Sequence, residues 1–203
     1  MRGRGVAGTA GPALVAIAAV VLAGCGGSSR AVTLAGNPSG YLIAPAQLGS
    51  PDFTVYEAAA PVGAGWLDQA SAAALTRDGW LRAAEVEYYR AVAFATSNGP
   101  ITLSVTVASF TGAGGAAAAL TRLQAALDAR PGAEPVSSGT LRGGHAIAIE
   151  GSDVDGVPAV EFVMVWRVDN LIDSFVAEGR YGGLQLSQLL PMATTESADE
   201  VRG

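Results

Sequence analysis

The chain has 203 residues, half of them hydrophobic, and its 18 acidic and 12 basic side chains give a formal net charge of −6. A negative surface repels nucleic acid, so we expect no nucleic-acid partner. All 12 basic residues are arginine. Without lysine the chain cannot use Schiff-base catalysis, a serine–lysine dyad or a phosphate-binding loop that needs a lysine.

The first 24 residues have the pattern of a signal peptide. Arg2 and Arg4 precede an uncharged apolar run at residues 12–22. That run is about half as long as the ~20 apolar residues that a membrane-spanning helix needs. We therefore predict that residues 1–24 are removed during export. Two arginines leave with them, so the mature chain keeps 10 basic against 18 acidic residues, a formal charge of −8.

The signal pattern ends in Leu-Ala-Gly-Cys at residues 22–25. These residues resemble the lipobox of bacterial lipoproteins, and the lysine-free, alanine-rich composition is typical of a GC-rich bacterial genome. The resemblance implies that Cys25 is the lipid attachment site and carries fatty acids such as palmitate. Two or more acyl chains anchor a protein stably. The mature protein is therefore expected on the outer face of the cytoplasmic membrane, in the cell envelope.

The chain contains one cysteine, Cys25, and one histidine, His145. The folded domain therefore has no internal disulfide, no thiol nucleophile and no cysteine-based zinc site. We expect neither a metal nor another cofactor, and a monomer or weak dimer that is stabilised by packing alone.

Residues 25–40 are rich in glycine and serine, which predicts a flexible tether ahead of a single domain at residues 41–203. The first predicted element is a short helix over 66–78. Its apolar residues recur at helical spacing, and Gly79 is a plausible stop.

The next two elements are predicted strands that form an antiparallel hairpin. Residues 84–95 alternate, with Glu85, Glu87 and Tyr89 on one side. The opposite side carries Val86, Tyr88, Val92 and Phe94. A turn at Asn98 and Gly99 leads to residues 101–107, in which apolar residues alternate with Thr102, Ser104 and Thr106.

An amphipathic helix is predicted to follow, on the spacing of Ala116, Leu120, Leu123 and Leu127. Three strands near 145–150, 157–168 and 171–178 then form a meander with turns at 153–156 and 169–170. The middle strand is apolar on both sides, so both of its sides should be covered. A closing helix is expected within 184–201, with Pro191 near its first turn or at a kink.

These elements predict an α+β fold with a mostly antiparallel sheet of about five strands and helices on one face. The predicted order is helix, two strands, helix, three strands, helix. This order loosely resembles small secreted lipoproteins of GC-rich bacteria, some with a PsbP-like fold, over residues 40–200. The members of that group are mostly without an assigned reaction.

Three motifs suggest chemistry but have simpler explanations. Gly112, Gly114 and Ala117 fit a dinucleotide-binding pattern, yet the strand before them is half polar, unlike a Rossmann strand. Asp153 and Asp155 resemble the start of a calcium loop that lacks its later ligands, which favours a hairpin turn. His145 has no partner that the sequence identifies, so no catalytic residue is assigned.

A candidate ligand-binding surface lies on the polar side of the first hairpin. If the two strands share that side, one face offers hydroxyls, carboxylates and an aromatic ring. The candidate residues are Tyr89, Glu85, Glu87, Thr102, Ser104 and Thr106.

The leading functional hypothesis is a membrane-anchored extracytoplasmic lipoprotein that binds an envelope protein or a small ligand and is not an enzyme. One alternative is a hydrolase or lipid-handling enzyme that uses His145 with a carboxylate. Another is a carrier of an apolar ligand, which would need a large internal cavity.

Overall fold

The computed structural model describes residues 33–50, 52–67, 71–139, 141 and 143–202. The predicted signal peptide and Cys25 lie outside these residues. Within the described residues, no helix is both long enough and apolar enough to cross a membrane.

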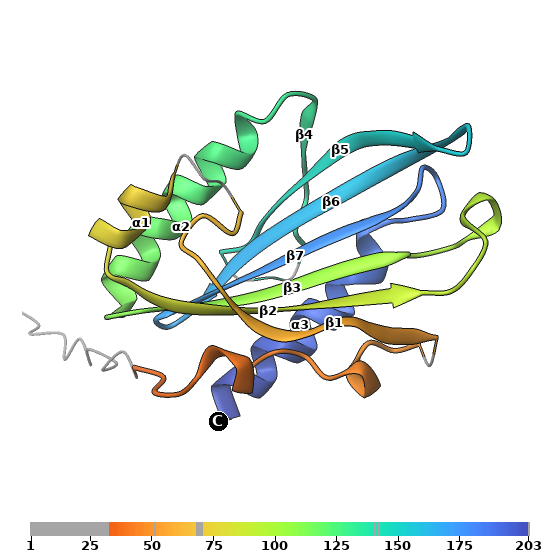
Figure 1. Cartoon of the computed structure of the whole chain (residues 1–203). Helices are drawn as coiled ribbons and strands as arrows, with labels where there is room; N and C mark the ends of the chain where they lie inside the picture. The colour runs from red at the N-terminus through yellow and green to blue at the C-terminus, as the bar shows by residue number, and fades with distance from the viewer. Residues whose placement is uncertain (1–32, 51, 68–70, 140, 142, 203) are drawn as a thin grey trace, which may run out of the picture. The chain divides into compact units, whose positions relative to one another are not determined.

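The described chain forms one sheet of seven strands in the order β1-β2-β3-β7-β6-β5-β4 (Figure 1). Every neighbouring pair is antiparallel. The strands are β1 (Phe53–Val62), β2 (Trp80–Arg90), β3 (Thr102–Phe110), β4 (Ala133–Val136), β5 (His145–Val154), β6 (Val157–Val168) and β7 (Leu171–Arg180).

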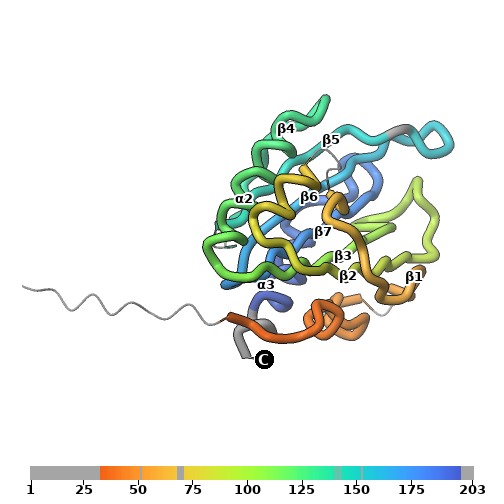
Figure 2. Tube along the Cα trace, turned by 60° about the vertical axis from the view of Figure 1, so that its left-hand side comes forward, coloured from red at the N-terminus to blue at the C-terminus, as the bar shows by residue number. Residues whose placement is uncertain are grey.

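Helices lie on both sides of this sheet (Figures 1 and 2). α1 (Ala72–Arg77) and α2 (Ala113–Asp128) pack on one face. α3 (Leu186–Arg202) packs on the other, beside a segment that contains the short 3-10 helices η1 (Pro38–Gly40) and η2 (Pro45–Gln47). A further 3-10 turn, η4 (Phe94–Thr96), lies between β2 and β3.

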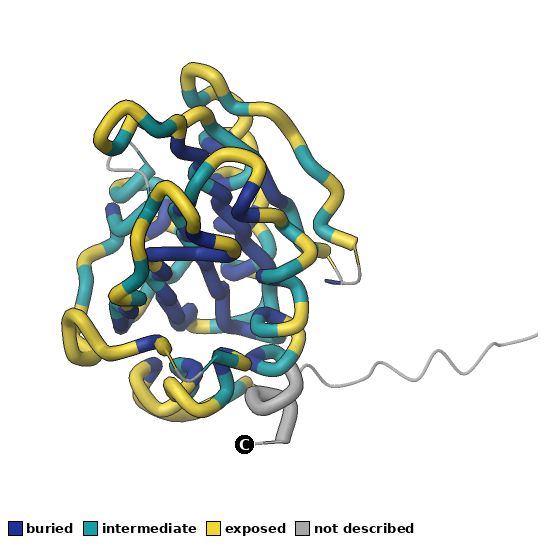
Figure 3. The backbone as a smooth tube through the Cα atoms, turned by 90° about the vertical axis from the view of Figure 1, so that its right-hand side faces the viewer, coloured by how far each residue is buried: buried dark blue, intermediate teal, exposed yellow. Residues whose placement is uncertain are grey.

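The core consists of two apolar layers, one on each face, and buried residues gather in the strands between them (Figure 3). β6 contributes to both layers. Phe162, Met164 and Trp166 face α3, whereas Val163 and Val165 join the layer under α2. The prediction that both sides of this strand are covered is confirmed.

The predicted fold class was wrong in three respects. The sheet has seven strands instead of about five, helices cover both faces instead of one, and a strand, β1, precedes the helix that was predicted as the first element. β1 and β4 were missed because both are edge strands. Nearly all of β1 is exposed, and each strand contains a proline, so neither shows the alternating burial by which strands are identified.

Several predicted elements are confirmed, with shifted ends. The helix over 116–127 is α2, and its four predicted apolar residues are all buried. The meander is β5-β6-β7, with Asp155, Gly156 and Asp169 at positive φ in its turns. β2 ends at Arg90, so Val92 and Phe94 lie outside it.

The described part of the segment that was predicted as a tether contacts the domain. The backbone N–H of Leu34 donates to Asn170 Oδ1 at 2.7 Å, and Asn170 Nδ2 donates to the Leu34 carbonyl at 3.3 Å. Pro38 is buried. These contacts hold residues 34–38 beside the turn between β6 and β7.

Candidate functional site

One end of the sheet face that carries α1 and α2 is left open. In Figure 1 both helices lie near one end of the strands, and β2, β3 and β6 extend beyond them. The described residues place no helix over that extension. We call this region the open face.

Strand register places polar side chains together on the open face. In β2, Glu85, Glu87 and Tyr89 alternate with buried residues and therefore project to the same side. Their partners in β3 are Thr106, Ser104 and Thr102 respectively. Thr102 in turn pairs with Glu178 of β7, and Glu178 pairs with Glu161 of β6. Residues far apart in the sequence thus form one row across the sheet.

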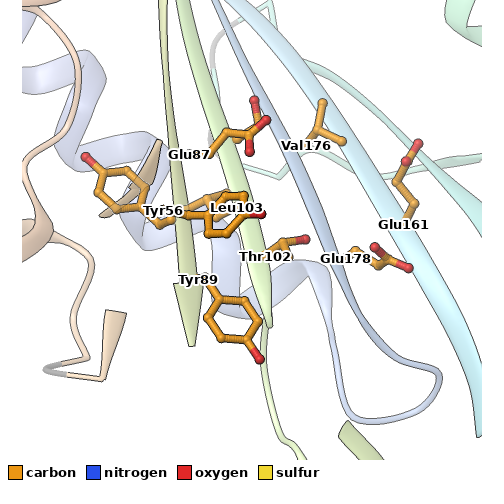
Figure 4. A pocket seen from close by; sticks show the side chains of 10 residues that line it. Tyr56, Glu87, Tyr89, Thr102, Leu103, Glu161, Val176 and Glu178 are labelled. Carbon is orange, nitrogen blue, oxygen red and sulfur yellow. The ribbon is translucent and has the colours of Figure 1, made fainter. Parts of the chain in front are cut away.

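A pocket of about 460 Å³ opens on this face, and we call it the acidic pocket (Figure 4). This volume is within the range of small-molecule sites, roughly 300–1,000 Å³. Its lining residues are Tyr56, Glu87, Tyr88, Tyr89, Thr102, Leu103, Ser104, Glu161, Val176 and Glu178.

β1 supplies Tyr56 through an irregularity in its pairing with β2. Val55 pairs with Tyr88 and Glu57 pairs with Glu87, so Tyr56 is an extra residue at a register shift. Such bulges redirect side chains. The Tyr56 ring lies 6.4 Å from the Tyr89 ring, centroid to centroid, with their planes at 52°. The two rings form an aromatic wall beside the carboxylates.

The six candidate residues predicted from sequence lie on this face, and four of them line the pocket. These four are Tyr89, Glu87, Thr102 and Ser104. Glu85 accepts a hydrogen bond from the Ser104 hydroxyl, next to the pocket. Thr106 is buried further along the same face of β3.

Sequence reasoning missed Tyr56, Glu161 and Glu178. Tyr56 belongs to the unpredicted strand β1. Glu161 and Glu178 lie in predicted strands, but only the order of the strands shows that β7 and β6 follow β3. A signal was present for Glu161, because it is the one charged residue within the apolar run 157–166.

Like charges accumulate around Glu87. Partial burial, and then the nearby carboxylates of Glu57 and Glu85, raise the pKa of Glu87 above its ordinary value. These neighbours oppose the ionisation of Glu87, which disfavours the folded state at neutral pH.

Two further pockets adjoin the acidic pocket. One of about 660 Å³ shares Glu161 and Val176 with it and reaches Trp66 and the C-terminal end of α2. There Arg130 Nη2 lies 2.9 Å from Glu161 Oε1. The other pocket, of about 330 Å³, shares Tyr89, Thr102 and Glu178. We refer to these three adjoining pockets together as the groove.

The other candidate motifs lie away from this groove. His145 Nε2 lies 2.8 Å from Asp128 Oδ1, at the surface where α2 ends and β5 begins, and neither residue lines the groove. Asp155 and Gly156 form the β5–β6 hairpin turn. Gly112 precedes α2, but β3 belongs to an antiparallel sheet and not to a parallel Rossmann sheet. Among the described residues, no three His, Cys, Asp or Glu side chains could hold a metal ion together.

The fold and the groove define a class: a single antiparallel sheet with helices on both faces and one end of a face left open. No protein family model matches the chain, and no curated protein matches its sequence. A solved structure does share the fold, namely the extracellular domain of PknH from Mycobacterium tuberculosis. The TM-score is 0.61 at 11% sequence identity, over 81% of this chain and 95% of that chain.

Proposed function

We propose that the protein is a lipid-anchored lipoprotein of the cell envelope that binds a ligand in the acidic pocket and does not convert it. The lipobox-like residues 22–25 support the proposed location and lipid attachment. The similarity to a domain described as extracellular is consistent with a position outside the cytoplasm.

The observation that carries the binding proposal is the hollow on the open face. The two apolar layers of the core are covered by helices or by residues 38–48, whereas this region combines a pocket, two exposed tyrosines and several carboxylates. If these residues had only a structural role, uncharged or covered side chains at this end of the sheet would make the folded state more stable. Sites that oppose stability in this way are typical of functional surfaces.

Ligand-observed NMR with a library of small fragments tests this proposal on the mature chain (residues 25–203) with Cys25→Ser. Thr102→Trp places a large ring in the pocket and should abolish binding of the fragments that the wild-type surface retains. Thr121→Trp, on the exposed side of α2, is the matched control and should leave binding intact. The proposal would be contradicted if no fragment binds, or if the fragments bind the wild-type surface, Thr102→Trp and Thr121→Trp equally.

A hydrolase is a second candidate because His145 does have a carboxylate partner, Asp128. This pair has the contact that a general base needs. If the protein is a hydrolase, it should cleave a p-nitrophenyl ester, and His145→Ala should reduce kcat/KM by about 100-fold or more. Hydrolysis that is absent, or equal in the variant, would exclude this candidate.

A further inference from the structure

We infer that the acidic pocket binds an organic cation, with an ammonium or guanidinium group among the carboxylates of Glu87, Glu161 and Glu178 and beside the rings of Tyr56 and Tyr89. This inference rests on the proposed binding function and adds the chemical class of the ligand.

The first argument is the charge of the groove. Three carboxylates line the acidic pocket, one each from β2, β6 and β7, and none of its lining residues is basic. Among the described residues that line the three adjoining pockets, Arg130 is the one basic side chain, and it forms an ion pair with Glu161. These two charges offset each other, so Glu87 and Glu178 supply the net negative charge. An anionic ligand would be repelled, whereas a cation would be attracted.

The second argument is the aromatic wall, which is independent of the carboxylates. Tyr56 is 70% exposed and Tyr89 is 39% exposed, although large aromatic side chains are commonly buried in a hydrophobic core. Tyrosine rings attract cations that lie over their faces, and this arrangement is a recurrent way to bind ammonium groups. The exposed rings therefore favour an ammonium or guanidinium group over a neutral polar ligand.

The third argument is the size of the pocket, about 460 Å³. Within the part of the chain that the structure describes, no three acidic, histidine or cysteine side chains are close enough to hold one metal ion. Carboxylates distributed around a hollow of this size suit a molecule with one or more charged nitrogens instead of a single small ion.

The titration of Glu87 supports the same conclusion. Its pKa is raised by burial and by Glu57 and Glu85. A bound cation would offset that repulsion and would compete with the proton. Cation affinity should therefore increase as the pH rises through the raised pKa of Glu87.

Isothermal titration of the mature Cys25→Ser chain with spermidine and with arginine amide tests the inference, with succinate and a neutral triol as comparison probes. We expect the two cations to bind and the two comparison probes not to bind. Combining Glu87→Gln with Glu178→Gln should weaken cation binding by roughly tenfold or more, because two charge-assisted contacts are lost. Glu134→Gln, a single change of the same kind on the exposed edge strand β4, is the control and should leave affinity unchanged.

Tyr56→Leu removes the aromatic ring but keeps a large apolar side chain, and it should also weaken cation binding. Tyr56→Phe keeps the ring and should largely retain binding. Thermal melts confirm that each variant is folded. Equal cation affinity in the carboxylate variants and the control would overturn the inference. Binding of only neutral or anionic probes would also overturn it but would leave the binding function standing. Absence of binding by these probes and by every fragment would reject both.

Discussion

Tyr88 shows how a single residue joins the N-terminal segment to the sheet. It is 2% exposed in β2, and its hydroxyl donates a hydrogen bond to the backbone carbonyl of Ile43. Burial, and then the charge of Glu196 in α3, raise the pKa of Tyr88 to about 12. The neutral phenol is thus the form that the folded protein requires.

Tyr88→Phe should lower the free energy of unfolding by about 1–2 kcal/mol, because the Ile43 carbonyl would lose its donor in a buried setting. Urea denaturation at pH 7 measures this, with the exposed Tyr181→Phe as a control that should not change it. An unchanged midpoint for Tyr88→Phe would show that the hydrogen bond adds nothing.

The raised pKa of Tyr88 also predicts a dependence on alkaline pH. Between the ordinary pKa of 10.0 and about 12, the folded state retains a proton that the unfolded state releases. Stability contributed by this group is therefore present below pH 10 and decreases as the pH rises through that interval. Tyr88→Phe should show a smaller decrease than the wild type in melts from pH 9.5 upward.

Glu87 has the opposite effect on stability at neutral pH. Its raised pKa means that the folded state binds the proton more tightly than the unfolded state, so ionisation destabilises the fold as the pH rises through that pKa. Glu87→Gln should therefore raise stability at pH 7 by up to about 0.5 kcal/mol, the usual scale of surface changes. A lower melting temperature for this variant would contradict the like-charge explanation.

At the scale of elements, the segment before β1 is part of the core. Ile43 and Leu48 are 2% and 0% exposed and belong to the apolar layer that also contains Phe162, Met164 and Trp166. α2 covers Val163 and Val165 on one face of the sheet, and the segment shares the opposite face with α3.

Leu48→Ala should cost about 2–5 kcal/mol of stability, the usual range for truncation of a fully buried leucine. The physical reason is the cavity it leaves between the segment and the sheet. Leu81→Ala, at a site that is 53% exposed, should change stability by about 0.5 kcal/mol or less. Equal effects of the two substitutions would show that the segment is only loosely attached.

The elements that could be predicted are those with a strong period. α2 was identified from its apolar spacing, and β3 from the alternation of Thr102, Ser104 and Thr106 with apolar residues. β1 could not be predicted, because an edge strand with an exposed surface has no period to detect. The same limit applies to the pocket. Its β2 and β3 residues follow from alternation within one hairpin, whereas Glu161 and Glu178 join them only through the order of strands that are distant in sequence.

At the scale of the whole molecule, the proposed lipid anchor depends on Cys25. Cys25→Ser should abolish incorporation of a labelled fatty acid and block cleavage after residue 24, because the acylated sulfur is the expected substrate for processing. Metabolic labelling with a fatty-acid analogue, followed by fractionation of membranes, measures both. Equal labelling of the two forms would refute the lipoprotein assignment.

The hydrogen bonds between Leu34 and Asn170 determine which end of the domain an anchor would hold. Leu34 follows Cys25 by nine residue positions, and an extended chain of that length reaches about 30 Å. Glu178 lies eight residues beyond Asn170 along the strand direction, about 26 Å at 3.3 Å per residue. If Cys25 is acylated, the lipid anchor would therefore join the described domain through Leu34, at the end of the sheet that is remote from the acidic pocket.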